Sequence, residues 1–253
     1  MIITSPIINF AHRGASRECP ENTMAAFRRA VELGATGIET DVQMTRDGRL
    51  VLIHDERLER TTNGKGWVKD QTWEELAGLD AGSWFKGGAY AGERIPLLED
   101  LLELALGSRL VLNIELKNGR CFYPGMEQKV IAAVRACGLG SWTVISSFNH
   151  YSLALCRTLA PEIGTGILYS EGLYRPWAYA ASLGAGALHA EYRTALPELV
   201  REAAACGVVF HPWTVNEPAE MSALIESGVA GIITDEPGML SALLERRLNP
   251  PPP

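Results

Sequence analysis

Two short runs of this sequence place acidic side chains at alternate positions. Glu39 and Asp41 lie in the run 37–43, and Glu115 and Lys117 lie in the run 112–117, each alternating with apolar or small residues. Successive side chains of a β-strand point to opposite faces, so each run predicts a strand with one apolar and one polar face. The apolar faces are expected to pack on helices, which directs the three acids to the inside of the fold.

The three carboxylates would converge if these two strands are neighbours. Ionised carboxylates at close range repel one another unless a cation joins them. A ligand set of oxygen atoms alone favours Mg²⁺ or Ca²⁺ over Zn²⁺. The alternative is an internal salt-bridge cluster in which Arg13 and Lys117 neutralise the acids. Because two adjacent strands contribute acids, we favour a single divalent cation held by Glu39, Asp41 and Glu115.

Two histidines are expected beside these acids. His12 ends an apolar run at 7–12, and His54 ends another at 50–54. Asp47 and Gly48 form a hairpin signal, so the run 50–54 should fold back antiparallel on 36–43. That pairing sets His54 opposite residue 40 or 41. Two imidazoles across a metal site can remove a proton from an attacking group and donate one to a leaving alcohol.

Cations are needed to hold an anionic substrate, because the formal net charge of the chain is −7. Arg13 and Lys117 are placed to bind a phosphate group and to stabilise charge that develops on its oxygens. Phosphodiester hydrolysis fits this set better than glycoside hydrolysis, which uses two carboxylates without a cation cluster. The sequence also contains neither G-x-S-x-G nor H-E-x-x-H. The remaining histidines, His150, His189 and His211, are interpreted as structural.

The elements that must position these residues alternate along the chain. Strands are expected at 7–12, 36–43, 50–54, 109–116, 143–147, 164–168, 186–190, 208–214 and 230–234. Helices are expected at 22–33, 97–106, 124–137, 150–159, 173–183, 195–206, 217–226 and 237–247. With 50–54 assigned to a hairpin, eight strands and eight helices remain, which predicts one (β/α)8 TIM barrel domain over residues 1–253.

Residues 55–96 interrupt this alternation and are predicted to be an insertion over the barrel mouth, with a short helix near 72–79. The insertion is rich in aromatic residues. They are expected either to cover the site or to form a small core that holds the insertion in place. The aromatic residues are Trp67, Trp73, Trp84, Phe85 and Tyr90.

At these positions the sequence resembles the glycerophosphodiester phosphodiesterase family, and in particular its compact bacterial cytoplasmic members. The matching motifs occur in order over nearly the whole chain, but the resemblance is weak between residues 160 and 207. They include His12-Arg13-Gly14-Ala15-Ser16, Pro20-Glu21-Asn22-Thr23, Ile38-Glu39-Thr40-Asp41-Val42, Ile53-His54-Asp55, Arg60-Thr61-Thr62-Asn63-Gly64, Asn113-Ile114-Glu115-Leu116-Lys117, Trp213-Thr214-Val215-Asn216 and Ile233-Thr234-Asp235-Glu236-Pro237.

The resemblance implies hydrolysis of glycerophosphodiesters to sn-glycerol 3-phosphate and an alcohol. It assigns the divalent cation to Glu39, Asp41 and Glu115, and general base and acid to His12 and His54. It also places Arg13 and Lys117 on the phosphate and Trp213 beside the glycerol. Two alternatives stay open: a lysophospholipase D-type activity of the same site, which would need an apolar trough, and a barrel that binds phosphorylated ligands without catalysis.

The overall composition narrows the partners and the compartment. A sequence pI of about 5.3 argues against binding to nucleic acid or to an anionic membrane surface. The five cysteines form no C-x-x-C pair and suit a reducing compartment. The start of the chain lacks the basic region of a signal peptide. We therefore expect a cytoplasmic enzyme that acts on a small molecule; no pattern predicts its oligomeric state.

Overall fold

The computed structural model describes residues 7–248, so the ends of the predicted domain, 1–6 and 249–253, lie outside the described residues. The strands are β1 (Ile8–His12), β2 (Gly37–Met44), β3 (Leu50–Leu52), β4 (Val111–Leu116), β5 (Thr143–Ser147), β6 (Gly164–Tyr169), β7 (Ala187–Ala190), β8 (Val209–Phe210) and β9 (Gly231–Thr234). The helices are α1 (Met24–Glu32), α2 (Trp73–Ala77), α3 (Leu98–Ser108), α4 (Met126–Ala136), α5 (His150–Leu159), α6 (Pro176–Ser182), α7 (Pro197–Ala205), α8 (Pro218–Ser227) and α9 (Pro237–Leu248).

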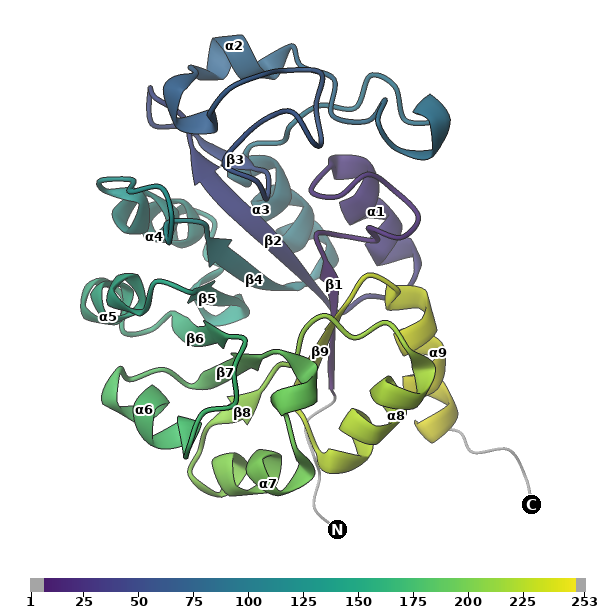
Figure 1. Ribbon diagram of the computed structural model, residues 1–253, viewed down its shortest axis with the longest axis vertical. Coiled ribbons are helices and arrows are strands. Elements are labelled where there is room, and N and C mark those ends of the chain that lie inside the picture. The colour runs from purple at the N-terminus through teal and green to yellow at the C-terminus, as the bar shows by residue number, and fades with distance from the viewer. Residues whose placement is uncertain (1–6, 249–253) are drawn as a thin grey trace.

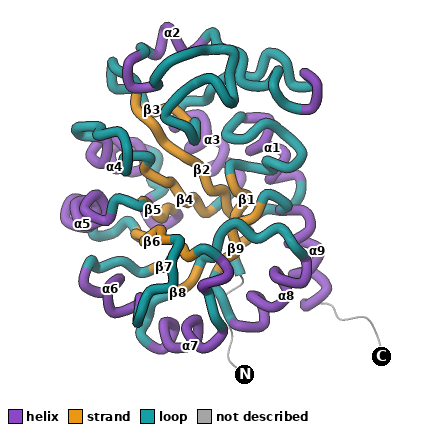
Figure 2. The backbone as a smooth tube through the Cα atoms, viewed as in Figure 1, coloured by secondary structure: helices purple, strands orange, loops and turns teal. Residues whose placement is uncertain are grey.

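Eight parallel strands form a ring, and helices surround it (Figure 1, Figure 2). The strand order is β8-β7-β6-β5-β4-β2-β1-β9. Backbone hydrogen bonds between β9 and the segment that begins with β8 close the ring, including Ala230 N to Phe210 O at 3.1 Å and Ile233 N to Pro212 O at 2.9 Å. The predicted TIM barrel is therefore confirmed.

The apolar sides of the strands and helices form one core between the two layers. Ile38 and Val42 of β2 and Leu112 and Ile114 of β4 are fully buried in it, together with Phe27 of α1. Burial of these alternate positions on one side fixes the strand faces, because a shift of one residue would turn every side chain over. The intervening positions of β2 and β4 then face the barrel interior, as the alternation predicts.

The predicted hairpin is present, with a shorter second strand. β3 pairs antiparallel with β2 in the register Val42 to Leu52, so that residue 54 falls opposite residue 40. The regular strand ends at Leu52, although Ile53 N still donates to Asp41 O at 3.1 Å. The turn that carries Asp47 and Gly48 therefore brings the residues after β3 back along the strand that carries two of the acids.

The predicted strand at 208–214 is the element that differs most from expectation, since β8 covers only Val209–Phe210. Pro212 has no N–H to donate to a neighbouring strand, and this limits regular pairing. The backbone nevertheless stays aligned with β7, because His211 N donates to Leu188 O and Trp213 N to Ala190 O, both at 2.9 Å. The segment after β8 therefore still reaches the mouth of the barrel.

Residues 55–96 lie beside the barrel at the upper edge of Figure 1 and contain α2. They share a small core with Val51 and Ile53 of the preceding hairpin, separate from the main one, and Trp73 packs against it. Phe85 makes edge-to-face contacts with both Trp84 and Tyr90. Trp73, Trp84, Phe85 and Tyr90 therefore help to hold the insertion in place, which is the second of the two roles considered for its aromatic residues. The core consists of Val51, Ile53, Leu58, Val68, Leu76, Ala81 and Ile95.

Candidate active site

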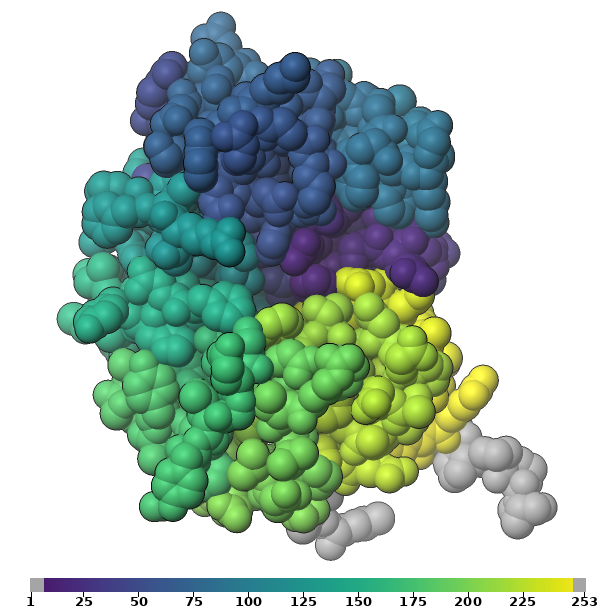
Figure 3. All heavy atoms as spheres, in the orientation of Figure 1, coloured from purple at the N-terminus to yellow at the C-terminus, as the bar shows by residue number. Residues whose placement is uncertain are grey.

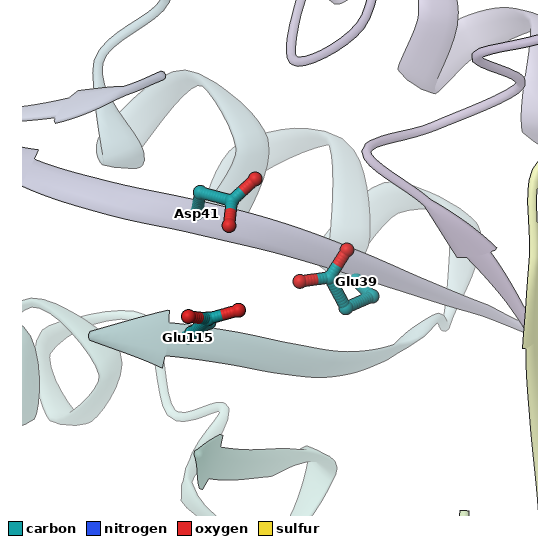
Figure 4. Close-up of side chains that lie close together, drawn as sticks. All are labelled: Glu39, Asp41 and Glu115. Carbon is teal, nitrogen blue, oxygen red and sulfur yellow. The ribbon is translucent and has the colours of Figure 1, made fainter. Parts of the chain in front are cut away.

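The three acids meet inside the barrel, on two neighbouring strands. In the parallel pair β2 and β4, Glu39 is aligned with Asn113 and Asp41 with Glu115. One carboxylate oxygen from each acid lies within 4.8 Å of the others, and the three carboxylates point into the same space (Figure 4). All three side chains are buried, and Asp41 is completely inaccessible to solvent. The geometric requirement for a shared cation is met.

Burial and mutual repulsion make the charged forms of two of these acids unfavourable. Burial, together with the neighbouring Asp41 and Glu115, raises the pKa of Glu39 well above its usual value. Burial and Asp41 raise the pKa of Glu115 to about 7. Burial would also raise the pKa of Asp41, but Arg13 and Lys117 outweigh it and keep this pKa below its usual value. The surroundings therefore do not favour full ionisation of all three acids.

The two nearby cations do not neutralise this cluster. Arg13 Nε lies 3.1 Å from Asp41 Oδ2, but Arg13 also forms an ion pair with Glu21 at 2.9 Å. Lys117 Nζ lies 2.8 Å from Glu115 Oε1 and 3.6 Å from Asp41 Oδ1. Within residues 7–248, the buried Asp41 Oδ1 accepts no hydrogen bond. A buried carboxylate oxygen without a donor, in a cluster of excess acid, fits a divalent cation better than a completed salt bridge.

His12 is held by an acid from the far end of the chain. Its Nδ1 lies 2.6 Å from Asp235 Oδ1, just after β9. Asp235 also accepts hydrogen bonds from Ser16 Oγ at 2.9 Å and Asn216 Nδ2 at 2.7 Å. Burial opposes ionisation of Asp235, but these partners lower its pKa to about 2. An ionised carboxylate can only accept, so the proton of the pair lies on His12 Nδ1, and the other ring nitrogen, Nε2, faces Glu39 Oε2 at 3.9 Å.

His54 has the same arrangement and lines the same pocket as His12. Its Nδ1 lies 2.7 Å from Asp55 Oδ1. A hydrogen bond from Arg60 is the main cause that lowers the pKa of Asp55 to about 2, which makes this carboxylate an acceptor as well. The backbone carbonyl of His54 accepts a hydrogen bond from Gln43 Nε2 at 3.0 Å, and Gln43 in turn accepts one from Tyr123. Both histidines therefore have their Nδ1 atom engaged by an acid.

A pocket of about 90 Å³ lies over these groups at the mouth of the barrel. Phe148 and Trp213 form one wall, with ring centroids 5.8 Å apart in an edge-to-face contact. Trp213 Nε1 donates to His189 O at 2.8 Å, which fixes the indole ring. The pocket is lined by His12, Arg13, Glu39, His54, Asn113, Glu115, Lys117, Phe148, Leu168, Trp213, Thr214 and Ile233.

The structure brings all eight predicted site residues together. Seven of them line the pocket, and the eighth, Asp41, lies beneath it in contact with Arg13 and Lys117. In the described part of the chain, the five aromatic residues of the insertion do not line this pocket. They do not supply the apolar trough that a lysophospholipid would require.

Two of the three histidines interpreted as structural form a buried pair below the pocket. His211 Nδ1 lies 3.1 Å from His189 Nε2, and His189 Nδ1 lies 3.3 Å from Asn113 Nδ2. Burial lowers the pKa of both rings, in His211 to about 4, so both are neutral. His150 lies outside the pocket and contacts Tyr179 and the Leu168 carbonyl. These contacts agree with structural roles.

At the mouth of the barrel the two cations can hold a phosphate group while the two histidines move protons, which is the chemistry of a hydrolase of phosphate esters. Residues 12–239 match the model of the glycerophosphoryl diester phosphodiesterase family. The chain belongs to this family and is a phosphoric diester hydrolase.

Individual relatives agree with this assignment. A glycerophosphodiester phosphodiesterase of Caldanaerobacter subterraneus is 50% identical over 236 residues, which cover 93% of this chain and 97% of that protein. The crystal structure of a glycerophosphodiester phosphodiesterase from Agrobacterium tumefaciens has a TM-score of 0.82 and 32% identity, covering 94% of this chain and all of that one. A phosphodiesterase of Oleispira antarctica, solved with the product sn-glycerol-3-phosphate, has a TM-score of 0.84 and 31% identity, covering 95% of this chain and 97% of that one.

No helix within the described residues has the length and apolar character needed to cross a membrane.

Proposed function

We propose that this chain hydrolyses glycerophosphodiesters to sn-glycerol 3-phosphate and an alcohol, with one divalent cation and with His12 and His54 as the acid–base pair. The observation that carries the proposal is that two imidazoles, each bound to a carboxylate through Nδ1, line one pocket with Glu39 and Glu115 of the acid cluster. The product found in the Oleispira antarctica structure supports the choice of substrate.

Glu39, Asp41 and Glu115 would hold the cation, which is Mg²⁺ or Ca²⁺ on the basis of their oxygen ligands. When bound, such an ion relieves the repulsion among the acids and polarises a phosphoryl oxygen. A bound divalent ion would explain why three buried acids lie near only two positively charged side chains.

Arg13 and Lys117 are the protein side chains that bind the phosphate group, in addition to the cation. Both line the pocket, and both are held by acids of the site, Arg13 by Glu21 and Lys117 by Glu115. Their positive charge compensates for the net charge of −7 where the substrate must enter. Trp213 offers an apolar face for the carbon chain of glycerol, next to Phe148.

Proton transfer takes place at the Nε2 atoms of the two histidines. In each ring Nδ1 donates to an ionised aspartate, so Nε2 accepts a proton in the neutral form and donates one in the charged form. One histidine takes a proton from the attacking oxygen, which belongs to water or to a hydroxyl group of the substrate, and the other protonates the leaving alcohol. Asp235 and Asp55 hold the rings and stabilise their charged forms.

A coupled assay for glycerol 3-phosphate tests the proposal, with glycerophosphocholine as substrate and with or without excess EDTA. Activity should be lost in EDTA and restored by Mg²⁺ or Ca²⁺. Full activity in EDTA would refute the requirement for a metal.

Two variants separate the assigned roles. Glu115→Gln should weaken metal binding, whereas His54→Ala should bind metal normally and lose turnover by a factor on the order of 10²–10⁴. His150→Ala is the matched control, since His150 lies outside the pocket and should keep full activity. Normal turnover of His54→Ala would remove His54 from the acid–base pair.

A further inference from the structure

Arg60 of the insertion binds two carboxylates at once. Its Nε and Nη2 atoms donate to Asp55 Oδ2 and Oδ1 at 2.6 and 2.9 Å. Its Nη1 and Nη2 atoms donate to Glu21 Oε2 and Oε1 at 2.7 and 2.8 Å. Glu21 lies in the loop between β1 and α1, 39 positions away, so this guanidinium joins the insertion to the barrel. Figure 3 shows the blue insertion against the purple N-terminal segment.

Each of these carboxylates also holds a residue of the site. Glu21 Oε1 accepts a hydrogen bond from Arg13 Nη1 at 2.9 Å, and Asp55 Oδ1 binds His54 Nδ1 at 2.7 Å. A continuous chain of charged hydrogen bonds therefore runs from Arg13 through Glu21, Arg60 and Asp55 to His54. Arg60 stands at its centre and lies outside the pocket lining.

The positive and negative charges along this series of hydrogen bonds are equal in number. Two guanidinium groups and two carboxylates alternate, and Glu21 is shared between Arg13 and Arg60. Sharing matters because a carboxylate devoted to Arg13 alone would neutralise the cation that must bind phosphate. Burial opposes ionisation of Glu21, but Arg60 and Arg13 outweigh it and lower its pKa. Glu21 is only 13% exposed, whereas Arg60 is 43% exposed, so removal of Arg60 leaves a nearly buried acid with one partner.

We infer that Arg60 is a positioning residue, which sets the orientations of both Arg13 and His54 from the insertion by clamping Glu21 and Asp55 together. The inference rests on the roles proposed above for Arg13 and His54. It assigns the insertion a part in catalysis, although its aromatic residues do not line the pocket. The insertion has further contacts with the same loop, since Lys86 Nζ and Tyr90 Oη donate to Glu18 O, both at 3.1 Å.

The clamp requires the geometry of arginine. A planar guanidinium can bind one carboxylate on each of two edges, whereas a lysine ammonium is a point charge on a flexible stem. Arg60→Lys should therefore fail to hold both acids even though it keeps the charge. Loss of a group that orients residues of a site typically reduces activity about 10–100-fold.

The test compares Arg60→Ala, Arg60→Lys and Arg57→Ala with the wild-type enzyme. Arg57 lies in the same insertion but its side chain pairs with the exposed Glu59, so Arg57→Ala is the matched control. For both Arg60 variants we expect kcat to fall and KM for glycerophosphocholine to rise, with unchanged metal affinity and unchanged circular dichroism. Free guanidinium, at a concentration that leaves the wild-type enzyme folded, should restore part of the activity of Arg60→Ala.

Rescue by guanidinium distinguishes a positioning role from a role in stability. If Arg60→Ala only lowered the stability of the fold, added guanidinium ion could not restore turnover. Full activity of Arg60→Lys would overturn the inference, as would an activity loss in Arg60→Ala that guanidinium does not reverse. Failure of the proposed function would give a different result. The wild-type enzyme would then not hydrolyse glycerophosphocholine, or His54→Ala would keep normal turnover. An active wild type with an inactive His54→Ala and a fully active Arg60→Ala would refute only the role of Arg60.

Discussion

His12 Nδ1 lies 2.6 Å from Asp235 Oδ1, although 223 positions separate the two residues in the chain. The contact exists because β1 and β9 are neighbours in the barrel and end at the same mouth. Closure of the barrel thus assembles the pair from the two ends of the described chain. The orientation of His12 consequently depends on the last strand of the fold.

Asp235→Asn should lower kcat strongly while metal affinity stays unchanged. The neutral amide can present its N–H group to His12 Nδ1, which favours the wrong tautomer and leaves the charged imidazole without a counter-ion. We expect a loss on the order of 10²–10⁴-fold in kcat. Steady-state kinetics and calorimetric titration of the metal provide the measurement. Ser16→Ala, which removes one of several hydrogen bonds to the same carboxylate, is the control and should lose far less.

Metal binding should depend on pH near neutrality because of Glu115. Its pKa in the folded, metal-free protein is raised from a usual 4.5 to about 7. A group with a raised folded pKa contributes stability that is full below the unfolded pKa and is lost as pH rises through the folded one. The metal-free protein should therefore lose stability between about pH 4.5 and pH 7. The bound metal, which needs the ionised acid, should stabilise the protein more at pH 8 than at pH 6.

Thermal unfolding in EDTA and in Mg²⁺ at both pH values measures this effect. The difference in Tm between the two conditions should be larger at pH 8, and calorimetry at pH 6 should show proton release on binding. The same difference in Tm at both pH values would contradict the prediction. Glu115→Gln cannot ionise and should weaken the dependence, leaving the part that comes from Glu39.

Gly166→Ala should destabilise the barrel beneath the site. A Cβ atom at this position would lie 2.4 Å from His189 Nε2, and the ring cannot move away because both its nitrogens are hydrogen-bonded. Overpacking of this kind costs about 1–3 kcal/mol. Gly164→Ala, on the same strand, is the control, because its nearest neighbour would be at an ordinary 3.6 Å. Denaturant unfolding of the two variants should separate them clearly, and equal stabilities would contradict the packing argument.

The sequence was sufficient to predict the parts of the site that follow from local periodicity. Alternation identified Glu39 and Asp41 on one face of a strand, and the turn at Asp47 and Gly48 predicted the hairpin that brings His54 back to them. These features depend on neighbours in sequence. The barrel followed from the regular order of strands and helices.

The residues that orient the site were harder to predict. Asp235 follows a strand and precedes a helix that begins with Pro237, where an acid has an ordinary structural explanation. The available signals were its place in the motif Ile233-Thr234-Asp235-Glu236-Pro237 and its position at the same end of the barrel as His12. Glu21 and Arg60 meet across 39 positions through an insertion without periodicity, so their pairing depends on tertiary structure alone. His189 lies in the region where the resemblance to the family is weak.

The central claim, one divalent ion shared by three acids, is tested most directly by a crystal structure with Mn²⁺ and glycerol 3-phosphate, using anomalous scattering to locate the metal. The account predicts one ion with an oxygen of each of Glu39, Asp41 and Glu115 at about 2.0–2.6 Å, and phosphate oxygens beside it. An ion bound elsewhere, with these acids paired only to Arg13 and Lys117, would contradict it.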